Sequence, residues 1–262
     1  MLENGTTVAN FFIVGAQKAG TTALHSYLSN HSELSLSSRK ELHLFDNETI
    51  DWKEPNYTSL KLRMGGAAKK VRGEATPIYM YWPKSIERLH AYDPSAKIIV
   101  LLRHPVFRAH SNWRMETKRQ AEDLPFHEAI RSGRSRVKNA ENGVHRVYSY
   151  VERGFYANQI NRILKYFPRS QVHFITTDHL WSEPKLSLNA IEDFLNISQE
   201  LTPENEYIIS ANTDTGHQIR SIDYIFLMEL FSSDIRTTAE ITGLPLGEWF
   251  NKHYQEPIKN SK

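Results

Sequence analysis

Residues 11–24 read FFIVGAQKAGTTAL and join a short apolar run to a helical pattern through a glycine-containing loop. Gly15 and Gly20 are five positions apart, which is the spacing of the glycines in a phosphate-binding loop. Such a loop points backbone N–H groups at an anion, and the following helix N-terminus adds partial positive charge. Lys18 lies inside the loop, and Thr21 and Thr22 add hydroxyl donors. The stretch therefore predicts an α/β fold with a P-loop-like, anion-binding first loop.

The rest of the chain alternates between strand-length apolar runs and helical patterns. We predict strands over 10–14, 69–74, 97–102 and 171–175, and helices over 22–30, 83–92, 106–118, 125–132, 155–167, 184–195 and 221–243, the last as one helix or two. This alternation is typical of a central parallel sheet flanked by helices on both faces. Ligands then bind beyond the carboxyl ends of the strands. We expect one domain over 1–262, with its core at about 10–250.

The composition excludes several classes of protein. The 262 residues include no cysteine, and 32 Lys+Arg against 30 Asp+Glu give a net charge of +2. No disulfide, thiolate zinc site or cysteine nucleophile is therefore possible, and no nucleic-acid partner is expected. No apolar run approaches the roughly 20 residues of a membrane span, and the first ten residues lack a signal-peptide pattern. We expect a cytoplasmic protein.

A second anion site is predicted at the end of the strongest strand pattern. The run KIIVLL, residues 97–102, leads into Arg103, where a P-loop NTPase usually has an aspartate that helps to hold magnesium. Ser111 follows about two turns into the next helix. Two anion sites on one sheet edge fit a nucleotide that carries a ribose phosphate and a 5′ anionic group, and we expect no metal site.

Several motifs of the chain resemble the sulfotransferases that use 3′-phosphoadenosine 5′-phosphosulfate (PAPS). The segment GAQKAGTTAL, residues 15–24, resembles their 5′-phosphosulfate loop, and LLRHPVFRAHSNW, residues 101–113, resembles their 3′-phosphate segment. Residues 39–46, 152–156 and 167–172 are similar to segments of the heparan-sulfate-type and bacterial branch. The resemblance covers about residues 11–250.

The resemblance implies a role for individual residues. Lys18 contacts the phosphosulfate and stabilises the leaving phosphate. Ala19, Gly20, Thr21 and Thr22 complete its loop, and Arg103 and Ser111 bind the 3′-phosphate. Glu41 is the catalytic base, while His43 and Asp46 lie around the acceptor. PAPS is the co-substrate and adenosine 3′,5′-bisphosphate is the product.

Three departures from the family pattern concern the acceptor. Ala75 stands where the branch has an auxiliary lysine, the late loop over the 3′-phosphate matches poorly at 213–220, and the disulfide of secreted relatives is impossible here. The acceptor is therefore expected to be a glycan, a small metabolite or a carrier-bound hydroxyacyl chain.

The residues themselves leave some roles open. Glu41 and His43 are two positions apart, so on an extended segment they share one face, and either could take the acceptor's proton. The aromatic residues Tyr79, Tyr81 and Trp82 either line the substrate pocket or pack in the core. The cations of residues 131–153 are expected to form a solvated surface.

Two other functions compete with sulfuryl transfer. A P-loop nucleotide kinase or other phosphotransferase shares the glycine spacing, but Thr21 follows Gly20 where an NTPase has lysine. A non-catalytic nucleotide-binding module would need neither Lys18 nor Glu41.

Overall fold

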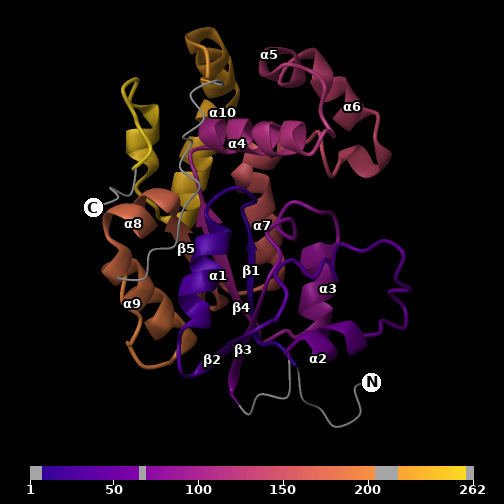
Figure 1. Ribbon diagram of the computed structural model, residues 1–262, viewed down its shortest axis with the longest axis vertical. Helices are drawn as coiled ribbons and strands as arrows, with labels where there is room; N and C mark the ends of the chain where they lie inside the picture. Colours follow the sequence, from indigo (N-terminus) through magenta and orange to yellow (C-terminus); the bar gives the residue numbers. More distant parts are fainter. Residues whose placement is uncertain (1–7, 65–68, 204–217, 258–262) are drawn as a thin grey trace.

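The computed structural model describes residues 8–64, 69–203 and 218–257 (Figure 1). Five strands form one sheet in the order β2-β3-β1-β4-β5, and each neighbouring pair is parallel. The strands are β1 Phe11–Gly15, β2 Leu34–Leu36, β3 Val71–Ala75, β4 Lys97–Leu102 and β5 Val172–Thr176. Because all strands are parallel, their carboxyl ends meet at one edge, as the sequence predicted.

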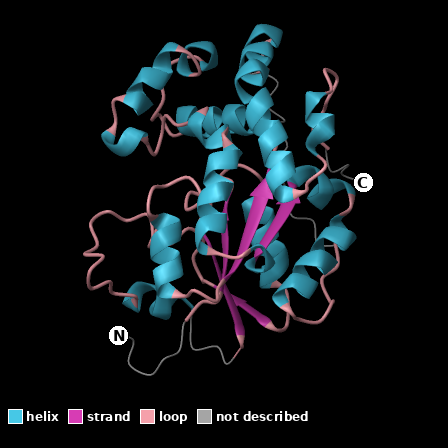
Figure 2. Cartoon of the chain, turned by 180° about the vertical axis from the view of Figure 1, so that it is seen from behind, coloured by secondary structure: helices cyan, strands magenta, loops and turns pink. Residues whose placement is uncertain are grey.

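Helices lie on both sides of the sheet, with α3 beside α7 on one side and α8 beside α9 on the other (Figures 1 and 2). The helices are α1 Thr21–Ser29, α2 Thr58–Met64, α3 Ser85–Tyr92, α4 Pro105–Lys118, α5 Phe126–Ala129, α6 Ser135–Lys138, α7 Tyr156–Tyr166, α8 Thr177–Ser182, α9 Pro184–Leu195 and α10 Ser221–Thr242. Short 3₁₀ helices cover Ser132–Arg134, Glu141–Gly143, Glu152–Gly154, Arg169–Gln171 and Leu246–Phe250. The α/β class is thus confirmed, while the single-domain assignment over 1–262 stays a prediction.

The core is built on the two strands that carry the strongest apolar runs. All five residues of β1 are buried, as are the last five of β4. Two helices show typical end signals: Pro105 occupies the first turn of α4, which follows β4, and Gly243 ends α10 in the left-handed region at φ 75°. Within the described residues, no helix is both long enough and apolar enough to cross a bilayer.

The structure differs from the sequence-based assignment in a few elements. β2, α2, α6 and α8 were not predicted, because segments of three to seven residues carry too little periodicity to stand out. The helix predicted over 125–132 is shorter, at Phe126–Ala129, and the one predicted from 83 begins at Ser85. The predicted long helix is a single one, α10. Most of the 213–220 segment lies outside the described residues.

Candidate active site

The loop after β1 has the backbone of an anion-binding turn. Lys18 and Gly20 both lie in the left-handed region, at φ 71° and 93°, and Gly20 is the N-cap of α1. Thr177 on α8 donates a hydrogen bond from its hydroxyl to the Ala19 carbonyl at 2.7 Å, which ties the loop to the strand edge. Thr21 is buried and Thr22 is exposed at the start of α1. The predicted loop residues therefore sit together at the N-terminus of α1.

The Lys18 ammonium is partly desolvated. Its Nζ lies 3.7 Å from the Met115 Sδ on α4. Burial, followed by the charge of Arg103, lowers the pKa of Lys18. A cation that has lost part of its hydration gains more from pairing with an anionic ligand than one in bulk water does.

Arg103 follows β4 and lies next to the same loop, because β1 and β4 are adjacent strands. Its Nη1 donates to the Lys18 carbonyl at 2.8 Å. Its other edge forms a two-point ion pair with Glu256, in which Nε and Oε1 are 2.5 Å apart. Ser111 is half-buried on α4, and no described residue binds its hydroxyl. Lys18 and Arg103 thus lie together at the ends of two adjacent strands, and a carboxylate from the C-terminal segment pairs with Arg103.

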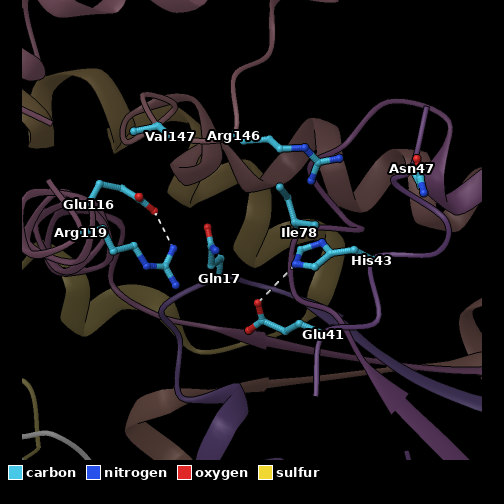
Figure 3. A pocket seen from close by; sticks show the side chains of 9 residues that line it. All are labelled: Gln17, Glu41, His43, Asn47, Ile78, Glu116, Arg119, Arg146 and Val147. Carbon is cyan, nitrogen blue, oxygen red and sulfur yellow. Dashed lines mark hydrogen bonds and ion pairs between the residues drawn. The ribbon is translucent and has the colours of Figure 1, made fainter. Parts of the chain in front are cut away.

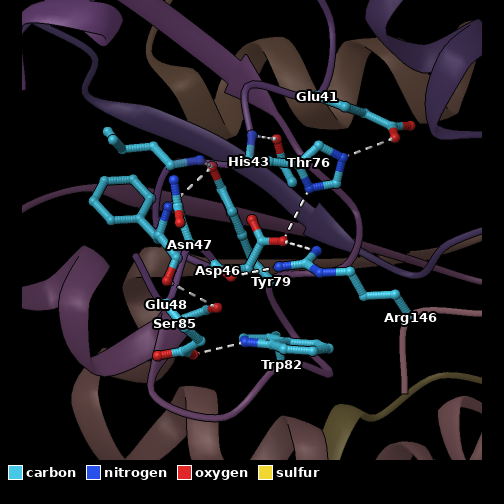
Figure 4. Close-up of polar contacts among 12 residues, drawn as sticks. Glu41, His43, Asp46, Asn47, Glu48, Thr76, Tyr79, Trp82, Ser85 and Arg146 are labelled. Atoms are coloured by element: carbon cyan, nitrogen blue, oxygen red, sulfur yellow. Dashed lines mark hydrogen bonds and ion pairs between the residues drawn. The ribbon is translucent and has the colours of Figure 1, made fainter. Parts of the chain in front are cut away.

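Residues 41–46 carry a chain of charged groups (Figure 4). The His43 Nδ1 lies 2.9 Å from the Asp46 Oδ2, and its Nε2 lies 3.7 Å from the Glu41 Oε2. The Lys40 Nζ lies 2.6 Å from the other Glu41 oxygen. Glu41 and His43 have φ of 61° and 53°, so a left-handed turn brings them together and not the extended segment that the sequence suggested.

These contacts set the charge of each group. The hydrogen bond to Asp46, followed by the one to Glu41, raises the pKa of His43 to about 9. Burial raises the pKa of Glu41, but hydrogen bonds and charges from His43 and Lys40 outweigh it and lower that pKa to about 2. At neutral pH the site therefore holds a protonated His43 between two carboxylates.

A pocket of about 420 Å³ opens beside this chain (Figure 3). It is lined by Gln17, Glu41, His43, Asn47, Ile78, Glu116, Arg119, Arg146 and Val147. Glu41 and His43 project into it on the side facing Arg119 and Gln17 (Figure 3). The predicted base candidates therefore line a cavity that adjoins the phosphate-binding loop, since Gln17 precedes Lys18.

The expectation that the cations of residues 131–153 are a solvated surface is wrong for Arg153, whereas Arg146 is exposed, as expected, but pairs with a buried carboxylate. Arg146 donates to the Asp46 carboxylate at 2.5 Å and to the Asp46 carbonyl at 2.6 Å. Arg153 is only 2% exposed; its guanidinium donates to the Gln17 side chain and to the Arg146 carbonyl. A polar run carries no local sign of such contacts, which join residues about 100 positions or more apart.

The three aromatic residues after β3 have different surroundings. Tyr79 is fully buried and its hydroxyl accepts from the Leu44 N–H at 3.0 Å, so it packs behind residues 41–46 and does not line the pocket. Tyr81 is buried, with its hydroxyl 2.9 Å from the Ser149 Oγ. Trp82 is half-buried beneath the Arg146 guanidinium, 4.3 Å from the ring centre. The prediction of a substrate contact is therefore corrected for Tyr79.

Comparison with known proteins identifies similar chains. The model of the sulfotransferase domain family matches residues 9–218. Human heparan sulfate glucosamine 3-O-sulfotransferase 6 is 32% identical over 201 residues, which cover 74% of this chain and 54% of that protein. The chain thus spans about half the length of this curated relative.

Two solved structures share the architecture. A sulfotransferase from Alicyclobacillus acidocaldarius is 27% identical, with a TM-score of 0.78 and coverage of 92% of this chain and 98% of its own. A mouse sulfotransferase complexed with PAP is 14% identical, with a TM-score of 0.57 and coverage of 90% and 87%, and shows the common fold.

Proposed function

Because the chain belongs to the sulfotransferase family, we propose that it transfers the sulfuryl group of PAPS to an acceptor hydroxyl and releases adenosine 3′,5′-bisphosphate. One observation carries the proposal: the strands β3, β1 and β4 are neighbours, so Lys18 after β1 lies beside Arg103 after β4, and Glu41 is hydrogen-bonded to the last residue of β3. A cation pair for a doubly anionic nucleotide and a carboxylate for an acceptor proton thus meet at one sheet edge.

The nucleotide site is proposed to use both ends of this arrangement. Lys18 and the backbone N–H groups of Ala19, Gly20, Thr21 and Thr22 bind the 5′-phosphosulfate, with the dipole of α1 behind them. Arg103 and Ser111 bind the 3′-phosphate. The Ser111 hydroxyl, which has no partner among the described residues, fits such an oxyanion, as does the two-donor edge of Arg103 that now binds the Glu256 carboxylate.

Glu41 is proposed as the base. His43 is already protonated at neutral pH and cannot accept a further proton. Glu41 is ionised and lines the pocket, so it can accept one. As the acceptor oxygen bonds to sulfur, Glu41 takes the hydroxyl proton and the bond from sulfur to the phosphate oxygen breaks. Lys18 stabilises the charge that develops on the leaving phosphate. His43 and Asp46 orient Glu41.

The acceptor is proposed to be a polar molecule with a free hydroxyl. Arg119, Arg146 and Glu116 line the pocket beside Glu41, so the walls offer donors and a carboxylate to a hydroxylated ligand. A glycan is the first candidate because the human relative is a heparan sulfate glucosamine 3-O-sulfotransferase. A small metabolite or a carrier-bound hydroxyacyl chain is the alternative.

Trp82 is next to this pocket, because its ring packs against the guanidinium of the pocket residue Arg146. The cytoplasmic location and a reaction without metal or nucleic acid stay predictions.

Nucleotide phosphotransfer is the competing function. Arg103 argues against this function, because such enzymes have a magnesium-binding carboxylate at the position of Arg103. The thermal stability of the protein should be measured with adenosine 3′,5′-bisphosphate and with ATP plus magnesium. We expect the melting temperature to rise with the bisphosphate. A melting temperature that rises with ATP plus magnesium but not with the bisphosphate would contradict the proposed function.

A further inference from the structure

The loop that carries Glu41 and His43 adopts a conformation that these residues do not favour by themselves. Both have positive φ, in the left-handed region that side chains with a Cβ rarely occupy. Such a turn persists only when its surroundings hold it. The question is therefore which groups hold residues 41–45.

Five consecutive backbone N–H groups of this loop donate to one short segment, residues 74–79. The acceptors are the Ala75 carbonyl for Glu41 at 2.9 Å, the Glu74 Oε1 for Leu42 at 3.2 Å, the Thr76 Oγ1 for His43 at 3.5 Å, and the Tyr79 hydroxyl for Leu44 at 3.0 Å and for Phe45 at 3.5 Å. Three of these acceptor groups are side chains. Ordinary sheet pairing uses only backbone carbonyls as acceptors, so these side chains hold the loop in addition to any sheet pairing.

The three side chains form a rigid support. Glu74, Thr76 and Tyr79 are each no more than 1% exposed. The Thr76 hydroxyl donates to the Glu74 carboxylate, so one of these side chains fixes another. Neither Glu74 nor Tyr79 lines the pocket.

We propose that Glu74, Thr76 and Tyr79 are positioning residues, which hold the 41–45 loop in the left-handed turn that points Glu41 and His43 into the pocket. The inference rests on the proposed function of Glu41 as the base. It assigns these three buried side chains a part in catalysis, although none of them lines the pocket.

Tyr79→Phe removes one hydroxyl and keeps the ring. Tyr92→Phe is a matched control, because the buried Tyr92 hydroxyl also accepts from two consecutive N–H groups, those of Val8 at 2.7 Å and Ala9 at 2.9 Å, just before β1. We expect Tyr79→Phe to lower kcat about tenfold while the affinity for adenosine 3′,5′-bisphosphate changes less than about twofold. Tyr92→Phe should lower the melting temperature by a similar amount and keep kcat.

A second measurement does not depend on turnover. Release of the loop separates His43 from its two carboxylates, so the pKa of His43, followed by NMR, should fall from about 9 toward its usual value in Tyr79→Phe and Thr76→Val. Thr76→Ser keeps the hydroxyl and should restore both kcat and the titration. A variant that keeps the wild-type kcat and the wild-type His43 titration would overturn the inference. If the wild-type protein transfers no sulfate, the proposed function fails, and the His43 titration still decides the positioning role.

Discussion

His43 lies between the carboxylates of Glu41 and Asp46, and this arrangement decides which groups carry protons at neutral pH. Its folded pKa of about 9 exceeds its usual value of 6.5. The stability that this proton adds is therefore complete below about pH 6.5 and is lost as the pH rises through about 9. The free energy of unfolding should decline over that interval more in the wild type than in a His43→Gln variant, as measured by urea denaturation.

The contribution of Asp46 can be tested on its own. Asp46→Asn removes the largest cause of the raised His43 pKa, so that pKa should fall by a unit or more in an NMR titration. Asp51→Asn, a change at an exposed position of the same segment, should leave it unchanged. An Asp46→Asn variant whose His43 still titrates near pH 9 would show that the hydrogen bond at 2.9 Å does not set the charge.

At the residue scale, the sequence indicated Glu41, His43 and Asp46 through motifs, and the structure brings them together by a turn that no local pattern encodes. Positive φ at a glutamate and a histidine is imposed by residues 74–79, which lie more than 30 positions away. Arg146 was missed for a similar reason, because its partner Asp46 is 100 positions away. Contacts of this kind depend on the tertiary fold and cannot be recognised in a single segment.

At the scale of elements, β1 and β4 were predicted within a residue because buried parallel strands are continuous apolar runs. Their adjacency brings Lys18 and Arg103 together. The C-terminal segment after Leu246–Phe250 was not expected at this site. Tyr254 stacks on His104 at 4.7 Å and donates to Asp178, which places Glu256 against Arg103.

The Glu256 carboxylate pairs with the Arg103 guanidinium edge, so it would compete with the 3′-phosphate that Arg103 is proposed to bind. Glu256→Gln should therefore strengthen binding of adenosine 3′,5′-bisphosphate about fivefold, the equivalent of an ion pair of about 1 kcal/mol. Binding of 5′-AMP, which has no 3′-phosphate, should not change, and neither affinity should change in the exposed-site control Glu248→Gln. Calorimetric titration measures both ligands. An equal gain for 5′-AMP, or none for the bisphosphate, would rule out this competition.

At the scale of the whole molecule, the polar stretch 131–154 folds back onto the carboxyl edge of the sheet. Arg153 is the buried link, since its guanidinium reaches Gln17 in the loop after β1, the Asn112 side chain on α4 and two carbonyls of its own segment. Burial, followed by the charge of Arg108, lowers its pKa to about 10. The composition of the stretch suggested solvent exposure, which shows that charge content alone cannot tell a surface from a buried polar network.

Removing the Arg153 side chain should lower the free energy of unfolding more than removing a nearby surface ion pair. Arg153→Met leaves several buried acceptors without a donor and should lower the free energy of unfolding by about 2 kcal/mol. Arg134→Met breaks a partly exposed pair with Glu152 and should cost no more than about 1 kcal/mol. Urea denaturation measures the free energy of unfolding of both variants. A larger loss of that free energy in Arg134→Met than in Arg153→Met would contradict the assignment.

The most direct test of the account is the transfer of labelled sulfate from PAPS to a panel of oligosaccharides, hydroxylated metabolites and carrier-bound hydroxyacyl chains. The account predicts a labelled product with one acceptor class for the wild type and for the exposed-site control Glu54→Gln. It predicts at least about a hundredfold lower rate for Glu41→Gln, the loss typical of a missing general base. Transfer by Glu41→Gln at the wild-type rate, or no labelled product from the wild type with any class, would contradict it.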